Sequence, residues 1–124
     1  MVDFESPLTV AVSVTDWNAS RAWYKEKLGL TEQFATEEGG WADFVGPGGA
    51  SIGLSALNGE PHPGAGGTVI TFSVQNIDAA RAELESKGVT FVGQNQEFPG
   101  MVRLATFEDP DGNQMMLAQS LMQP

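Results

Sequence analysis

The chain has 124 residues, 41% of them hydrophobic, which is enough for one compact domain with an ordinary buried core. The absence of cysteine excludes disulfides, thiolate zinc sites and a thiol nucleophile. A formal net charge of −10 argues against nucleic acid as a partner. No run reaches the roughly 20 apolar residues of a membrane-spanning helix, and the first residues lack the pattern of a secretory signal. We therefore expect a cytoplasmic protein that does not bind membranes.

The first half of the chain predicts a strand, a helix and three further strands. From Thr9 to Val14, valines alternate with small residues, as in a strand with one packed face. Asp16 is a suitable N-cap for a helix over about 17–28, which Gly29 ends. Short strands should follow near residues 31–36, 41–45 and 50–56, separated by turns rich in glycine and proline.

The second half repeats this order. At an offset of 60, Ser13 matches Ser73 and Arg21 matches Arg81. The repeat predicts a helix over about 77–87 and strands near 90–93, 101–107 and 114–119. An insertion at about 94–100 forms either a lid or a longer hairpin. The predicted class is thus α+β, with two βαβββ modules at about 8–57 and 68–120 and a linker at 58–67. We expect both to pack as a single domain, residues 1–124.

Two motifs carry a family resemblance. The segment 22–30, AWYKEKLGL, and the segment 108–113, EDPDGN, together resemble the vicinal oxygen chelate superfamily. That superfamily includes glyoxalase I, extradiol dioxygenases, fosfomycin resistance proteins and bleomycin-binding proteins. The resemblance implies a mixed, cup-shaped sheet built by both modules, with helices on its outer face. It also implies a homodimer.

Family enzymes usually hold a divalent metal with His, Gln or Glu at four strand positions. The resemblance places these positions at Thr9, Gly53, Val69 and Met116. None of these residues is a strong donor for a hard divalent cation. The only histidine, His62, lies in the predicted linker. We therefore predict that the usual metal site is absent and that no cofactor is bound.

Strand alternation predicts which side chains line the cup. The predicted ligand-binding residues are Thr9, Trp41, Asp43, Gly53, Val69, Thr71, Leu104, Thr106 and Met116. Trp41 beside Asp43 could hold a cation through its ring face and a charge pair. Alternatively, Trp41 fills the cup or packs at a dimer interface, and Asp43 is solvated.

Three functional hypotheses follow. The first is a metal-free protein that binds and sequesters a small cationic or aromatic molecule, as the antibiotic-resistance members of the family do. The second is an enzyme. It would be either a lyase, isomerase or dioxygenase with an atypical metal site, or a metal-free acid–base catalyst. No catalytic residue is assigned. The third is a dimerisation domain without a ligand.

Overall fold

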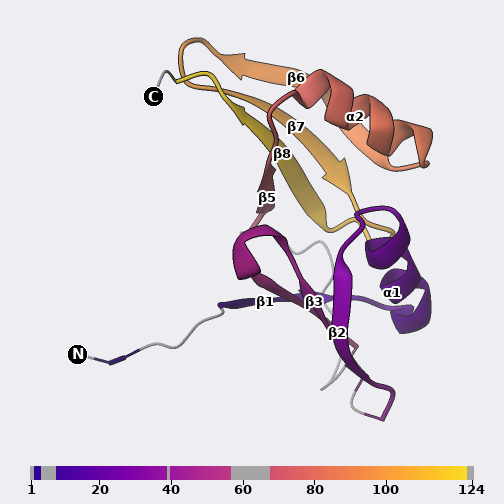
Figure 1. Cartoon of the computed structure of the whole chain (residues 1–124). Helices are drawn as coiled ribbons and strands as arrows, with labels where there is room; N and C mark the ends of the chain where they lie inside the picture. Colours follow the sequence, from indigo (N-terminus) through magenta and orange to yellow (C-terminus); the bar gives the residue numbers. More distant parts are fainter. Residues whose placement is uncertain (1, 4–7, 39, 57–67, 123–124) are drawn as a thin grey trace. The chain divides into compact units, whose positions relative to one another are not determined.

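The computed structural model describes residues 2–3, 8–38, 40–56 and 68–122. The chain divides into two compact units, residues 1–63 and 64–124, and each is described by itself. Among the described residues, each unit has one four-stranded sheet and one α-helix (Figure 1). The predicted linker, residues 58–67, lies outside the described residues. The packing of both modules into one domain stays a prediction.

Unit 1 has the predicted βαβββ order. Its elements are β1 (Thr9–Ser13), α1 (Trp17–Glu26), β2 (Thr31–Thr36), β3 (Trp41–Val45), the short 3-10 turn η1 (Pro47–Gly49) and β4 (Ser51–Ser55). The strands lie in the order β1-β4-β3-β2. β1 runs parallel to β4, and the other neighbours are antiparallel.

Unit 2 repeats this topology, which confirms the predicted α+β class. Its elements are β5 (Ile70–Ser73), α2 (Ile77–Ser86), β6 (Thr90–Phe98), β7 (Val102–Glu108) and β8 (Gln114–Ser120). The strands lie in the order β5-β8-β7-β6, with β5 parallel to β8. β6 is longer than the strand predicted for residues 90–93, because it continues through the insertion. The insertion is therefore a longer hairpin.

The helix boundaries follow from local chemistry. Asp16 accepts a hydrogen bond from the backbone N–H of Ala19 at 3.1 Å, and Asn76 accepts one from that of Ala79 at 3.0 Å. α1 ends two residues before the predicted Leu28, and α2 ends one residue before the predicted end. Neither helix in the described part of the chain is long and apolar enough to cross a membrane.

The core of each unit lies between its helix and one face of its sheet. Phe44 of β3 and Phe107 of β7 are both fully buried, as the alternation predicts. The Tyr24 ring of α1 lies 6.2 Å from that of Phe44, and the Phe91 ring lies 5.4 Å from that of Phe107. Large apolar side chains thus pack between the helix and the sheet of each unit, and the other face of each sheet is not part of this core.

A repeated arginine fastens each helix to the strand that follows it. Arg21 donates hydrogen bonds to both carboxylate oxygens of Glu32 in β2, at 2.9 and 2.8 Å, and its guanidinium lies 4.5 Å from the Trp17 ring. Its counterpart Arg81 lies 4.7 Å from the Phe91 ring. A bidentate pair of this kind fixes orientation as well as adding energy.

Arg81 also holds the irregular part of β6. The pairing of β6 with β7 shifts register between Val92 and Gln96. Within this bulge, the carbonyl of Gly93 and the side chain of Asn95 accept hydrogen bonds from Arg81, at 2.9 and 2.8 Å. On the same side of the sheet, Arg103 of β7 pairs with Asp78 of α2 at 3.2 Å. The hydrogen bonds from Arg81 therefore hold the bulge in place.

The bond between Arg21 and Glu32 predicts a pH-dependent stability. The hydrogen bonds from Arg21 hold the pKa of Glu32 below its ordinary value. Because the folded-state pKa is the lower one, the pair stabilises the fold above the unfolded-state pKa, and this contribution is lost as the pH falls through the folded-state pKa. We expect Glu32→Gln to lower the free energy of unfolding by about 1 kcal/mol at pH 7.

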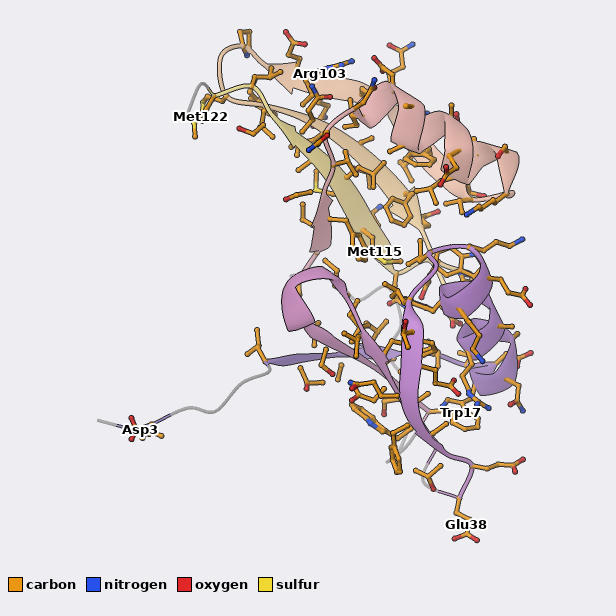
Figure 2. The ribbon with its side chains drawn as sticks, in the orientation of Figure 1. Asp3, Trp17, Glu38, Arg103, Met115 and Met122 are labelled. Atoms are coloured by element: carbon orange, nitrogen blue, oxygen red, sulfur yellow. The ribbon has the colours of Figure 1, made fainter. Side chains whose placement is uncertain are left out.

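Urea denaturation at pH 7 and pH 3 measures this effect. The difference between the wild type and Glu32→Gln should shrink towards pH 3. Glu38→Gln is the control, because Glu38 is an exposed residue at the β2–β3 turn (Figure 2). If the free energies of unfolding of the wild type and Glu32→Gln differed equally at both pH values, the assigned pair would be contradicted.

Candidate functional site

The face of the unit 1 sheet opposite the buried core carries the predicted site residues of that unit. Asp43 lies directly opposite Gly53 in the register of β3 and β4. Thr9 is paired with Ser51 at the start of β1 and β4. Since alternate residues of a strand share a face, Trp41 lies on the same face as Asp43, and Thr9 on the same face as Gly53. The structure therefore brings these four predicted residues onto one surface.

Trp41 lies on the backbone of Gly53. A Cβ atom built on Gly53 would overlap Cη2 and Cζ2 of the Trp41 indole and lie 3.0 Å from Cζ3. The six-membered ring thus leans diagonally from β3 onto β4, into space that only a glycine leaves open. Trp41 is half-buried, so part of the indole remains accessible. This arrangement makes an aromatic platform on the sheet.

Asp43 presents an oriented carboxylate beside this platform. Its Oδ1 accepts a hydrogen bond from the Ser51 hydroxyl, and its Oδ2 accepts one from Nε2 of Gln33 at 3.3 Å. Ser51 is only 1% exposed, so its position is set by the sheet. None of the ion pairs among the described residues involves Asp43. The carboxylate is thus held in place without a cationic partner from the described chain.

In unit 2, the corresponding face is less polar and carries no charged predicted residue. Thr71, Thr106 and Met116 lie side by side across β5, β7 and β8, and Leu104 lies one step along β7 on the same face. Val69 precedes β5, is 42% exposed, and its carbonyl accepts a hydrogen bond from Thr71 at 3.3 Å. The structure shows these positions; their role in binding stays a prediction.

The four positions that the family resemblance assigns to a metal do not fit one. Gly53 offers no donor atom, and the Trp41 ring lies where a ligand side chain would start. Thr9 offers a hydroxyl, Val69 an isopropyl group and Met116 a thioether, which are poor donors for hard divalent cations. The described residues also contain no cluster of three or more His, Cys, Asp or Glu side chains that could hold a metal.

Two residues that hold Asp43 were absent from the predicted set. Ser51 lies two residues from Gly53 in β4, so alternation alone places it on the same face. Gln33 follows Glu32, which points to the side of α1, so alternation places Gln33 on the face of Asp43 as well. The pairing of β2 with β3 shifts register between Glu32 and Phe34, so strand alternation fails only for the residues after Gln33.

Repeated βαβββ units, each with a mixed sheet under one helix, define the class of protein to which this chain belongs. The model of the Glyoxalase/Bleomycin resistance protein/Dioxygenase superfamily matches residues 7–117. The chain therefore belongs to this superfamily. No curated protein sequence matched it.

Solved structures show the same fold. TnmS3, an antibiotic binding protein from Streptomyces sp. CB03234, is 26% identical with a TM-score of 0.79, over 97% of this chain and 99% of that one. A superfamily member from Sphaerobacter thermophilus DSM 20745 is 27% identical with a TM-score of 0.80, over 94% and 98%. A lactoylglutathione lyase from Agrobacterium tumefaciens, over 94% and 95%, has a TM-score of 0.72, but at 17% identity it shows the fold alone.

Proposed function

We propose that this protein binds and sequesters a small cationic or aromatic molecule without using a metal. The observation that carries the proposal is the Asp43 carboxylate, which is oriented beside the Trp41 platform and forms no ion pair among the described residues. The likeness to TnmS3, an antibiotic binding protein, supports the same class of function. The proposal includes a homodimer in the cytoplasm, both inferred from the sequence.

The two groups contribute to binding in different ways. An indole face attracts a cation by roughly 0.5–2 kcal/mol, depending on how far the site is shielded from water. A carboxylate adds a charge pair, and the attraction between the two charges also becomes stronger as water is excluded. Thr9 and Gly53 would complete the surface in unit 1. In unit 2 the proposed contacts are Val69, Thr71, Leu104, Thr106 and Met116.

A ligand screen with a charge-neutral variant tests the proposal. We expect a panel of aromatic cations to raise the Tm of the wild type, because a ligand that binds only the folded state stabilises it. Asp43→Asn keeps the size of the side chain but removes its charge, so cations should bind about tenfold more weakly to this variant. The affinities of neutral aromatics should change little. Isothermal titration of the best cation and of a neutral aromatic into both proteins measures these affinities.

Glu38→Gln is the matched control, since it removes one carboxylate at the exposed β2–β3 turn of the same unit. It should bind the cation as the wild type does. A panel of cations and neutral aromatics that leaves the Tm unchanged would contradict the proposal. So would near-stoichiometric Ni, Zn, Fe or Mn in protein purified without a chelator, because that result favours an enzyme with an atypical metal site.

A further inference from the structure

A second aromatic side chain lies beside Asp43 on the opposite side from Trp41. In the register of β2 and β3, Phe34 is the residue paired with Asp43. On the other side of Asp43, its partner in β4 is Gly53, which the Trp41 ring covers. Phe34 of β2, the Asp43 carboxylate of β3 and the Trp41 ring, which lies over β4, thus form one row across the sheet.

The β2 bulge is what brings Phe34 to this face. With unbroken alternation, Glu32 and Phe34 would share a face, and Glu32 lies on the side of α1, where it pairs with Arg21. The register shift between Glu32 and Phe34 instead places Phe34 opposite Asp43. The Phe34 side chain is 56% exposed, so its ring is accessible to a ligand.

The hydrogen bonds of Asp43 limit the kind of cation that suits this row. Both carboxylate oxygens already accept a hydrogen bond, one from Ser51 and one from Gln33. Each oxygen keeps at most one further acceptor site, so the three N–H donors of a primary ammonium group could not all be satisfied by the carboxylate after losing their hydration, which is costly. An ammonium group covered by alkyl substituents needs no acceptors, and it gains from aromatic faces and from the nearby negative charge.

We propose that Phe34 is a specificity-determining residue and that the ligand carries an alkylated ammonium group, which is held between Phe34 and Trp41 over the Asp43 carboxylate. This inference rests on the proposed binding function and names its ligand class. Phe34 supplies one ring of the row, Trp41 supplies the other, and Asp43 supplies the charge. The β2 bulge positions Phe34 opposite Asp43, and Gln33 of the same strand holds the carboxylate.

Three small probes, two of them equal in size and shape and the third a smaller ammonium compound, test the ligand class. Choline carries a quaternary ammonium group, 3,3-dimethylbutan-1-ol is its neutral isostere, and ethanolamine carries a primary ammonium group. NMR titration, monitored at the indole N–H of Trp41, measures their affinities for the full chain. We expect choline to bind about tenfold more tightly than either of the other probes.

Phe34→Leu removes the ring but keeps an apolar side chain, and it should weaken choline binding about fivefold while leaving the affinity of the neutral isostere unchanged. Phe98→Leu is the matched control, because Phe98 is a similarly exposed phenylalanine, 48% accessible, on a strand of unit 2. Its choline affinity should equal that of the wild type. Thermal unfolding of both variants verifies that the fold is retained.

The outcomes separate this inference from the proposed function. Equal affinities for choline and its neutral isostere, or a Phe34→Leu variant that binds choline like the wild type, would overturn the inference. If larger aromatic compounds still bind at Trp41 in that case, the proposed binding function stands. If neither the probes nor the aromatic panel bind, the proposed function fails as well.

Discussion

Gly53→Ala is expected to displace the Trp41 indole from β4 while leaving the fold of unit 1 intact. The new Cβ would overlap the far end of the Trp41 ring, so the ring must move. It can do so because it belongs to a half-buried side chain and not to the backbone. In an open strand, alanine in place of glycine would stabilise by roughly 0.5–1 kcal/mol. Here the lost packing of the indole outweighs that gain, and we expect a net loss of about 1–2 kcal/mol.

The effect of Gly53→Ala on binding should be larger than its effect on stability. If the indole no longer lies beside Asp43, the ring and the carboxylate cannot act on the same cation. We expect at least a tenfold loss in the affinity of the best aromatic cation, measured by isothermal titration. The Trp41 indole N–H resonance should shift, while those of Trp17 and Trp23 in α1 should not.

The Trp41→Ala background provides the control for this prediction. Once the ring is absent, a Cβ at position 53 meets no clash from it, so Gly53→Ala should become neutral or stabilising. The difference between the two backgrounds measures the coupling between residues 41 and 53. An equal loss of stability in both backgrounds would show that the cost of Gly53→Ala does not arise from the indole.

The sequence predicts those parts of the site that depend on regular strands. Trp41, Asp43 and Gly53 lie in β3 and β4, where pairing is unbroken, so alternation places them on one face correctly. The direction of the Trp41 ring could not be predicted in the same way, because it depends on the space above a neighbouring strand. The glycine in the middle of β4 was nevertheless a signal, since such glycines often mark a close approach.

The same reasoning fails where a strand is irregular. Phe34 reaches Asp43 only because β2 is bulged, and the residues of a bulge have no distinctive pattern here. In unit 2, the insertion in β6 was visible as extra length, but the hydrogen bonds from Arg81 that hold its bulge were not. The repeat thus predicts the topology and the regularly paired strands of the site. The bulges, which the repeat does not predict, determine the rest of its surface.

Asp109→Ala is expected to be among the most destabilising single substitutions of a polar residue in unit 2. Asp109 begins the turn from β7 to β8 and is only 4% exposed. Its Oδ1 accepts hydrogen bonds from the backbone N–H groups of Asp111 and Asn113, at 2.9 and 2.8 Å. Its Oδ2 accepts one from the Asn113 side chain at 2.8 Å. Alanine would leave these donors without the carboxylate, at a cost of about 2–4 kcal/mol.

Urea denaturation at neutral pH measures this loss, and two variants resolve its cause. Asp109→Asn keeps an acceptor oxygen for the two backbone N–H groups, so it should lose about half as much. Pro110→Ala changes the same turn without touching the carboxylate, and it should cost at most about 1 kcal/mol. If Asp109→Ala were no more destabilising than Pro110→Ala, the hydrogen bonds of the carboxylate would not be what holds the turn. The hairpin of β7 and β8, which carries Leu104, Thr106 and Met116, would then owe its register to strand pairing alone.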